Sequence, residues 1–358
     1  MPLNHYRLLG RSGLRVSPIA LGTMTFGSDW GWGADDSVSH QQFKKYVEAG
    51  GNFIDTANFY TEGTSEKLLG NFLEGRRDQF VLATKYTLNM RPGDPNAGGN
   101  HRKNLFQSLE ASLKRLKTDY IDLYWVHIDD GLTPIEETMR ALDDAVRQGK
   151  IQYVGVSDMP AWKVAQANTL ALLRGWSPFV GLQIEYNLAE RTVERELMPM
   201  AQELGIGVTP WSPLAQGVLS GKYTEADLNP EPGAPQEPNA SAAPTEGRHE
   251  RNKQSGRLTA RTLAIANEAK AIGGEIGVSA SQVSIAWLLR QPGVTSPIIG
   301  ARTMAQLEDT LKAVDLTLTD EQLARLDAIS KIELGFPHDF LRGEMVRKFV
   351  SGDTQITK

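Results

Sequence analysis

Six polar residues each end a short apolar run between residues 55 and 212. If these runs are parallel strands of one closed barrel, their ends meet on a single face, and the active sites of such barrels lie on that face. One lysine, aspartate or histidine at a strand end is usually solvated or packed, but six in succession predict a site assembled from many strands. The six are Asp55, Lys85, His127, Ser157, Gln183 and Ser212.

The types of residue available favour proton transfer and exclude several other chemistries. The chain contains no cysteine, which removes thiolate nucleophiles, disulfides, iron–sulfur clusters and cysteine-ligated zinc. Its histidines show no close pair at metal-ligand spacing, so we expect no metal site. The histidines are at positions 5, 40, 101, 127, 249 and 338.

Between about residues 50 and 215 the chain alternates short apolar runs with stretches of helical periodicity. This alternation is typical of βα units on a parallel sheet. Stretches such as 101–116 and 134–149 carry apolar residues on one face and charges opposite, as the outer helices of a barrel would. We therefore predict a single (β/α)8 TIM barrel domain over residues 1–358. Its strands are expected near 20–23, 52–56, 80–85, 121–127, 153–158, 182–187, 206–212 and 296–300.

Three segments do not follow this alternation of strands and helices. Residues 5–17 are typical of two short strands joined by a glycine-containing turn, and we expect an N-terminal β-hairpin plugging the barrel bottom. Gly217 to Arg257 is rich in Pro, Gly, Asn and Ala without sustained periodicity, which predicts a long mobile loop on the catalytic side. The tail over residues 331–358 has one amphipathic piece around Phe340 to Phe349, and we expect it to fold back over the barrel.

Charge and hydropathy narrow the class of partner. The 38 basic residues are interspersed with 43 acidic ones, for a net charge of −5, so we expect no nucleic-acid partner. The first residues lack the continuous apolar segment of a signal peptide, and no long uncharged apolar run occurs elsewhere. We expect a cytoplasmic protein without a membrane partner. The sequence leaves a homo-oligomer open.

The motifs around the strand ends also follow the order of a known family. DTANFY, ATKY, DLYWVH, VGVSD, LQIEYN, TPWSPL and PIIGARTMAQLEDT succeed one another along the chain. The series resembles the signatures of the aldo-keto reductase superfamily over residues 6–315, and is most similar to the branch with bacterial aryl-aldehyde reductases and potassium-channel β subunits. The resemblance implies an oxidoreductase that reduces aldehydes or ketones with NADPH, releasing an alcohol and NADP+. It also implies a catalytic tetrad of Asp55, Tyr60, Lys85 and His127.

The chemistry of these four side chains fits that activity. A phenol with a pKa near ~10 is a poor acid at neutral pH unless its surroundings change that value. An ammonium group at Lys85 would lower the pKa of Tyr60, and Asp55 would keep that lysine charged. Tyr60 and His127 would then stabilise the alkoxide that forms as hydride arrives, without a metal.

No Rossmann fingerprint follows the first strand, because Gly22 and Gly27 enclose TMTF rather than a GxGxxG motif. Barrels bind phosphate through the loops after strands seven and eight and a helix N-terminus, where TPWSPLAQG and IIGARTMAQL lie. By resemblance, Trp211 stacks on the nicotinamide and Arg302 contacts the 2′-phosphate. Further cofactor contacts implied by the resemblance come from Gly22, Thr23, Met24, Asp55, Ser157, Asp158, Gln183, Ser212, Leu214, Gly217, Gly300, Thr303, Gln306, Asp309 and Thr310.

Three positions depart from the family pattern. Asp158 replaces the more usual Asn, and a carboxylate accepts hydrogen bonds but cannot donate one as an amide does. Asp309 and Thr310 stand where a Glu-Asn pair is common near the adenine. These departures put individual contacts in doubt rather than the cofactor itself.

Substrate selection would fall to loops on the catalytic face. Trp30 and Trp32, in the loop after the first strand, could form an aromatic wall beside Tyr60 and His127. The two indoles could equally be packed at the surface without contacting a substrate.

Two other functions remain open at this point. A Schiff-base aldolase could use Lys85, which ends an inner strand, although Asp55 would keep that lysine charged. An NADPH-binding regulatory subunit, like the channel β subunits, would retain the same fold, because a fold does not fix a function.

Overall fold

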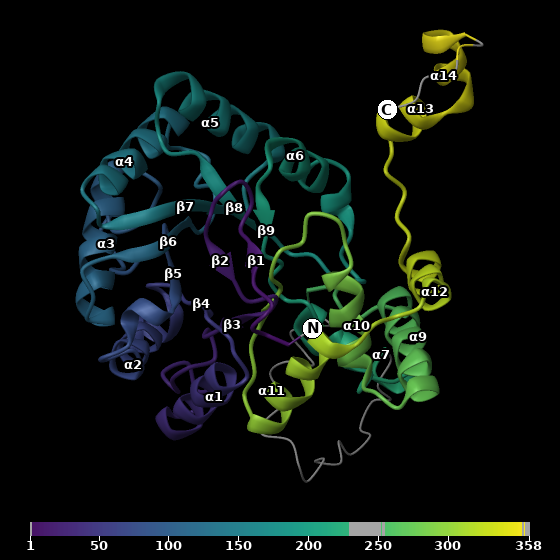
Figure 1. Cartoon of the computed structure of the whole chain (residues 1–358), viewed down its shortest axis with the longest axis horizontal. Coiled ribbons are helices and arrows are strands. Elements are labelled where there is room, and N and C mark those ends of the chain that lie inside the picture. Colours follow the sequence, from purple (N-terminus) through teal and green to yellow (C-terminus); the bar gives the residue numbers. More distant parts are fainter. Residues whose placement is uncertain (1, 229–251, 253–254, 353, 355–358) are drawn as a thin grey trace.

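Eight parallel strands form one sheet at the centre of the protein (Figure 1). The computed structural model describes residues 2–228, 252, 255–352 and 354. Strands β3 to β9 lie side by side in chain order, and β10 pairs with β3. The strands are β3 (Ala20–Gly22), β4 (Phe53–Asp55), β5 (Val81–Tyr86), β6 (Ile121–Val126), β7 (Ile151–Ser157), β8 (Phe179–Gln183), β9 (Gly207–Val208) and β10 (Ile298–Ile299).

Backbone hydrogen bonds join the two end strands of this sheet. The N–H of Thr295 donates to the carbonyl oxygen of Val208 at 2.7 Å, and the N–H of Ile298 donates to that of Pro210 at 2.8 Å. The sheet is thereby closed, and the C-terminal ends of its parallel strands share one rim. The predicted (β/α)8 TIM barrel is confirmed.

Two strands are shorter than the apolar runs predicted. β8 ends at Gln183 and β9 at Val208, whereas the runs continue to residues 187 and 212. Beyond β9, Pro210 has no N–H to donate toward the segment before β10, although the N–H of Trp211 still donates to the carbonyl oxygen of Ile184 at 2.9 Å. Past these ends a single bridge, between Glu185 and Trp211, connects the two segments. The residues that follow β8 and β9 therefore form irregular loops above the rim.

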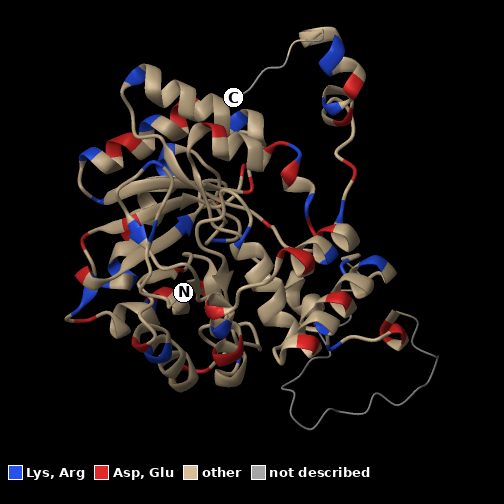
Figure 2. Ribbon diagram, turned by 45° about the vertical axis from the view of Figure 1, so that its right-hand side comes forward, with Lys and Arg blue, Asp and Glu red and all other residues tan. Residues whose placement is uncertain are grey.

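Helices surround the sheet because most connections carry an apolar stripe (Figure 1). In α4, Ile135, Met139 and Leu142 are buried at helical spacing, whereas Glu136 and Arg140 are exposed. Figure 2 shows basic and acidic residues interspersed over the helices. The helices are α1 (Asp36–Glu48), α2 (Thr64–Phe72), α3 (Arg102–Leu116), α4 (Ile135–Arg147), α5 (Ala161–Arg174), α6 (Leu197–Leu204), α7 (Glu225–Leu228), α9 (Ala260–Ile276), α10 (Ala280–Leu289), α11 (Met304–Leu311), α12 (Asp320–Ser330), α13 (His338–Arg342) and α14 (Glu344–Ser351).

Helices α9 and α10 form an apolar pair beside the barrel. α9 begins with a capping box in which Thr259 and Thr262 each bond the other's backbone N–H, and Ser279 caps α10. The pair has the length and apolar composition of a membrane span only when both helices are taken together, and a bend of 100° separates them. No single helix in the described part of the chain meets those criteria.

An N-terminal hairpin closes the bottom of the barrel. β1 (Arg7–Leu8) and β2 (Arg15–Val16) pair antiparallel. Next to them, Leu9 and Val16 are fully buried against Phe53, Val81 and other side chains inside the barrel. Because Phe53 and Val81 begin their strands, this apolar contact lies at the end opposite the rim. The predicted plug is confirmed.

Trp125 fills the middle of the barrel. Its indole lies so close to Gly155 and Gly181 that a Cβ atom at either glycine would come within 2.3 and 2.8 Å of it. Only glycine leaves room there, since real Cβ atoms do not approach other heavy atoms this closely. Trp125 is therefore a floor beneath the residues at the rim.

Two predictions about irregular segments have different outcomes. Most of the loop predicted over Gly217 to Arg257 lies outside the described residues, and its described start contains the end of the 3-10 helix η4 (Ala215–Ser220) and the helix α7. The predicted folding of the tail over the barrel is wrong: α13 and α14 project away from it (Figure 1). Glu196 bonds His338 at 2.9 Å, which fixes the base of the tail to the outer edge, while Phe349 at its far end is 75% exposed.

Candidate active site

Lys85 and Asp55 form a buried ion pair at the rim of the barrel. Asp55 ends β4, and Lys85 lies near the end of the neighbouring strand β5. Both side chains are almost completely buried. The Lys85 ammonium donates to Asp55 Oδ1, to the carbonyl oxygen of Thr56 at 2.8 Å and to Tyr60 Oη at 3.0 Å. These three bonds use all three of its donors.

A strained turn holds Tyr60 above this pair. Tyr60 begins the 3-10 helix η1 (Tyr60–Gly63), in which Thr61 and Glu62 have φ values of 46° and 56°. Such left-handed conformations are uncommon for residues other than glycine. The Thr61 hydroxyl donates to the carbonyl oxygen of Phe26 at 2.8 Å and stabilises the turn. The chain thus reverses within a few residues of Asp55 and brings the phenol onto the ammonium.

The pKa values of Lys85 and Tyr60 are both raised, by different causes. Burial alone would lower the pKa of Lys85, but the charge of Asp55 and the contact with Tyr60 outweigh burial and raise it. Burial raises the pKa of Tyr60, the charge of Lys85 lowers it by less, and the charge of Asp55 raises it further. The predicted lowering of the Tyr60 pKa is therefore not found. At neutral pH, Lys85 is therefore charged and Tyr60 is protonated.

His127 follows directly after β6, and its ring faces that of Tyr60. The ring centroids are 6.0 Å apart and the rings are nearly perpendicular. Burial, followed by the charge of Lys85, lowers the pKa of His127 to about 3. The imidazole is therefore neutral near pH 7, with one N–H to donate. Its Nδ1 has no hydrogen-bond partner within the described residues.

Gln183 connects the tetrad (Asp55, Tyr60, Lys85 and His127) to the far side of the barrel. Its Nε2 donates to Asp55 Oδ2 at 2.9 Å, so both oxygens of that carboxylate are occupied. Ser157 lies at the end of the neighbouring strand β7 and is also buried. The polar residues at the strand ends predicted that Asp55, Ser157 and Gln183 would lie on the same rim. Nothing in the sequence predicted the hydrogen bond between Gln183 and Asp55, which are far apart in the chain.

Asp158 and Trp211 are joined above Ser157. The indole Nε1 of Trp211 donates to Asp158 Oδ1 at 3.0 Å. Asp158 is exposed and Trp211 is half-buried, so a planar ligand could contact the ring. Asp158 has a φ of 44°, a conformation that Asp and Asn tolerate better than most residues.

The loops after β9 and β10 form two turns suited to phosphate. After β9, Ser212, Ala215, Gln216 and Gly217 all have positive φ, and Ser212 Oγ accepts from the N–H of Gln216 at 2.9 Å. After β10, Thr303 caps α11. Arg302 precedes the cap, and its Nε is buried without a hydrogen-bond partner among the described residues. An unsatisfied guanidinium beside a helix N-terminus is the donor set that a phosphate monoester requires.

The other predicted cofactor residues lie in three places. Gly22, Thr23 and Met24 follow β3 at the rim, where Thr23 is buried and Met24 is 45% exposed. Leu214 and Gly300 belong to the two loops just described, and Gln306 Oε1 accepts from the N–H of Arg302. Asp309 and Thr310 are engaged elsewhere. The carboxylate of Asp309 bonds Ser279 and Gln282 at 2.8 and 2.7 Å, and the hydroxyl of Thr310 donates within α11.

Three aromatic side chains lie together in the segments that follow β3 and β4. Trp30 lies 5.6 Å from Trp32 and 5.9 Å from Phe59 between ring centroids. Phe59 precedes Tyr60 and is 38% exposed. Sequence reasoning did not single out Phe59, although its position inside DTANFY could have suggested it. The three rings form one cluster, called the aromatic wall below, and Phe59 connects it along the chain to Tyr60.

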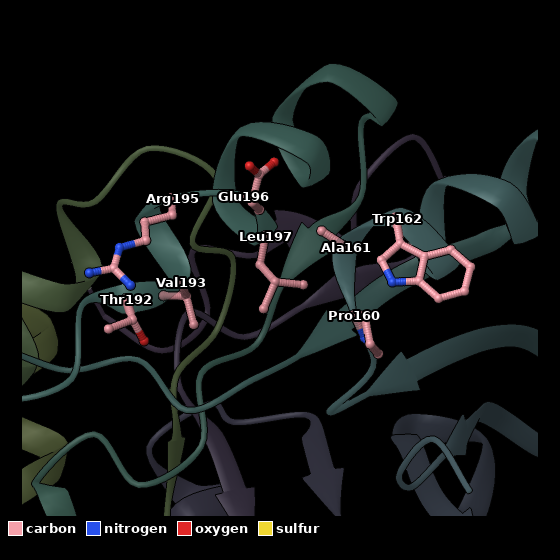
Figure 3. Close-up of a pocket in the computed structure, with 8 residues that line it drawn as sticks. All are labelled: Pro160, Ala161, Trp162, Thr192, Val193, Arg195, Glu196 and Leu197. Carbon is pink, nitrogen blue, oxygen red and sulfur yellow. The ribbon is translucent and has the colours of Figure 1, made fainter. Parts of the chain in front are cut away.

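A separate groove of about 590 Å³ lies on the outer edge of the same rim (Figure 3). The start of α5 and the loop after β8 form its walls. The indole of Trp162 is 68% exposed there. No tetrad residue lines this groove, so it lies apart from the candidate site. Its lining residues are Pro160, Ala161, Trp162, Thr192, Val193, Arg195, Glu196 and Leu197.

Comparison with known proteins gives the same family along most of the chain. The family model described as "Aldo/keto reductase family" matches residues 18–331. The norsolorinic acid reductase stcV of Emericella nidulans is 38% identical, over 98% of this chain and 88% of that protein. The aryl-alcohol dehydrogenase [NADP(+)] of Phanerodontia chrysosporium is 36% identical, over 93% and 88%. The uncharacterized oxidoreductase YrpG of Bacillus subtilis is 37% identical, over 90% and 95%.

Proposed function

The chain belongs to the aldo/keto reductase family, and from this premise we propose that it reduces aldehydes or ketones with NADPH through Asp55, Tyr60, Lys85 and His127. The observation that carries the proposal is the contact of Lys85 with both Asp55 and Tyr60, opposite a neutral His127. An acid, a charged group that tunes it and a second hydrogen-bond donor together suit a carbonyl that must become an alkoxide and then an alcohol.

Each side chain has one task in this proposal. Tyr60 holds the proton that the carbonyl oxygen takes up, and its raised pKa keeps that proton in place until a stronger base forms beside it. The neutral imidazole of His127 donates a hydrogen bond to the same oxygen and orients the carbonyl. Lys85 stabilises the phenolate that remains after proton transfer, and Asp55 keeps Lys85 charged and fixed. NADPH supplies the hydride when it is bound.

The residues present fit this cofactor. Arg302 Nε is buried without a partner among the described residues, and a 2′-phosphate would satisfy it. The turn from Ser212 to Gly217 would receive the pyrophosphate. Trp211 would stack on the nicotinamide, and Ser157, Asp158 and Gln183 would hold its carboxamide.

The relatives support an aromatic substrate class. One of them is named for norsolorinic acid and another for aryl alcohols, and this chain carries the wall of Trp30, Trp32 and Phe59. We expect aromatic aldehydes and ketones to be reduced with higher kcat/KM than short sugars such as glyceraldehyde. A panel of carbonyl compounds, followed by NADPH absorbance, tests this. Trp30→Ala should raise KM for the aromatic compounds selectively, and a preference of the unaltered protein for glyceraldehyde would count against the proposal.

The two other functions have less support. A Schiff base needs an uncharged lysine, whereas the pKa of Lys85 is raised by its contacts with Asp55 and Tyr60. The relatives reported above are named as a reductase, a dehydrogenase and an oxidoreductase, none as a channel subunit.

A further inference from the structure

Asp158 is held rigidly at the rim of the barrel. It follows Ser157 at the end of β7. Its N–H donates to the carbonyl oxygen of Gln183 at 3.2 Å, and its own carbonyl oxygen accepts from the N–H of Asp129 at 3.3 Å. The backbone on both sides is thus tied to a neighbouring segment, and the carboxylate has a fixed position beside Trp211.

Within the described residues, no basic side chain neutralises the charge of this carboxylate. Three other carboxylates near this rim each bond a cation: Asp55 bonds Lys85, Glu185 bonds Arg257 through both oxygens, and Asp129 bonds Lys163 at 2.6 Å. Asp158 instead accepts from the neutral indole N–H of Trp211. No basic side chain in the described part of the chain forms an ion pair with it.

We infer that Asp158 is a specificity-determining residue that makes the protein bind the oxidised nucleotide, NADP+, more tightly than NADPH. The inference rests on the proposed function, which puts the nicotinamide against Trp211. The oxidised nicotinamide ring carries one positive charge and the reduced ring carries none. A fixed carboxylate at this position therefore attracts one form and not the other. The neutral amide usual at this position would not distinguish them in this way.

The groups around Asp158 leave its negative charge without a cation that is free to pair with it among the described residues. Although the residue as a whole is exposed, partial desolvation of its carboxyl raises the pKa. Hydrogen bonds from the neutral groups of Trp211 and Ser157 lower this pKa, Glu185 raises it and Lys85 lowers it. The charges of Glu185 and Lys85 are committed to Arg257 and Asp55. The ionised carboxylate is thus under-compensated when the site holds no cation.

The preference has a consequence for the reaction. Bound NADPH would supply the hydride, with both electrons, to the carbonyl carbon, and the oxidised ring that results would carry one positive charge. The carboxylate of Asp158 stabilises the ring only after this transfer, so it favours reduction of the carbonyl on the protein. By the same interaction it delays release of NADP+.

The test compares dissociation constants of NADP+ and NADPH, measured directly by titration calorimetry without substrate. Asp158→Asn removes the charge, keeps an oxygen that accepts from Trp211 and tolerates the positive φ. We expect this variant to weaken the binding of NADP+ relative to that of NADPH by roughly tenfold, the size expected for attraction between two opposite charges that solvent and salt partly screen. Asp158→Gly should shift the ratio in the same direction. Asp129→Asn is the matched control, since it removes a carboxylate already paired with Lys163, and it should leave the ratio within about twofold.

The outcomes separate this inference from the proposed function. If both nucleotides bind and their ratio is the same in Asp158→Asn as in the unaltered protein, the inference is overturned. An equal shift in Asp129→Asn would also overturn it, since the effect would then be one of net charge. If neither nucleotide binds to the unaltered protein, the proposed function itself fails.

Discussion

The Nζ of Lys85 lies 3.0 Å from the Oη of Tyr60 while the same ammonium bonds Asp55. A charge that is already paired acts on the phenol more weakly than a free one would. Burial outweighs the effect of Lys85, the charge of Asp55 acts in the same direction as burial, and the pKa of Tyr60 is raised. The site is built to keep the proton on Tyr60 at neutral pH and to stabilise the phenolate once the proton has gone.

Removing the phenolic hydroxyl should impair chemistry and leave cofactor binding intact. General acid catalysis contributes ~10²–10⁴-fold in rate, so Tyr60→Phe should lower kcat for a good aldehyde by at least that factor. The phosphate turns and Trp211 are untouched, and the dissociation constant for NADPH should change little. A variant with near-normal kcat, in which a deuteride isotope effect shows hydride transfer to be rate-limiting, would rule out Tyr60 as the acid.

Breaking the buried ion pair between Lys85 and Asp55 should lower the free energy of unfolding. Lys85→Met leaves the Asp55 carboxylate buried with Gln183 as its remaining side-chain donor, and removing one partner of a buried pair lowers the free energy of unfolding by about 3–5 kcal/mol. The double variant Asp55→Leu with Lys85→Met should regain part of this loss, because no charge is then stranded. Urea denaturation of the unaltered protein, of Lys85→Met, of Asp55→Leu and of the double variant measures the free energies of unfolding that are compared. Additive losses in the double variant would be inconsistent with a coupled pair.

The stability of the protein should depend on His127 at acid pH. The pKa of His127 is about 3 in the folded protein and ~6.5 in an unfolded chain. The unfolded chain therefore binds a proton that the folded protein does not, and the contribution of His127 to stability is present above about pH 6.5 and is lost as the pH falls toward about 3. His127→Gln should flatten the pH dependence of unfolding in this window. His40→Gln, an exposed histidine, is the control and should match the unaltered protein, and identical slopes for all three proteins would contradict the prediction.

Arg302 should set the preference for NADPH over NADH. Its buried Nε has no partner among the described residues, and a charge-assisted bond to phosphate contributes about 1.5–3 kcal/mol. Arg302→Ala should thus weaken NADPH roughly ten- to hundredfold and NADH far less. Arg302→Lys should retain part of the preference, since it keeps the charge and loses the fork of donors. Equal losses for both nucleotides in a direct binding measurement would remove Arg302 from the phosphate site.

The barrel and the pairing of Lys85 with Asp55 were predictable from the sequence. Polar residues at the ends of parallel strands must share one rim, which is why Asp55, Lys85, Ser157 and Gln183 could be expected together. The lengths of β8 and β9 were less predictable, because the apolar runs continue past the residues at which the regular strands end.

Other features depend on packing that spacing does not encode. The direction of the Tyr60 pKa shift is the result of burial set against two opposite charges. The bond from Gln183 to Asp55 spans the barrel, and Phe59 joins Trp30 only after the turn at Tyr60 has formed. The tail was predicted to cover the barrel because its amphipathic pattern needs a surface, but periodicity does not say which surface.

The indole of Trp125, pressed onto Gly155 and Gly181, couples three positions on three adjacent strands by volume. A methyl group added at either glycine cannot be accommodated while the indole stays, and loss of the indole alone would leave a cavity whose formation costs about 3–5 kcal/mol. Lineages of this barrel should therefore exchange these residues together, with a smaller side chain at 125 accompanied by larger ones at 155 and 181. The same trade offers a protein engineer a way to reshape the floor under the tetrad without altering any side chain at the rim.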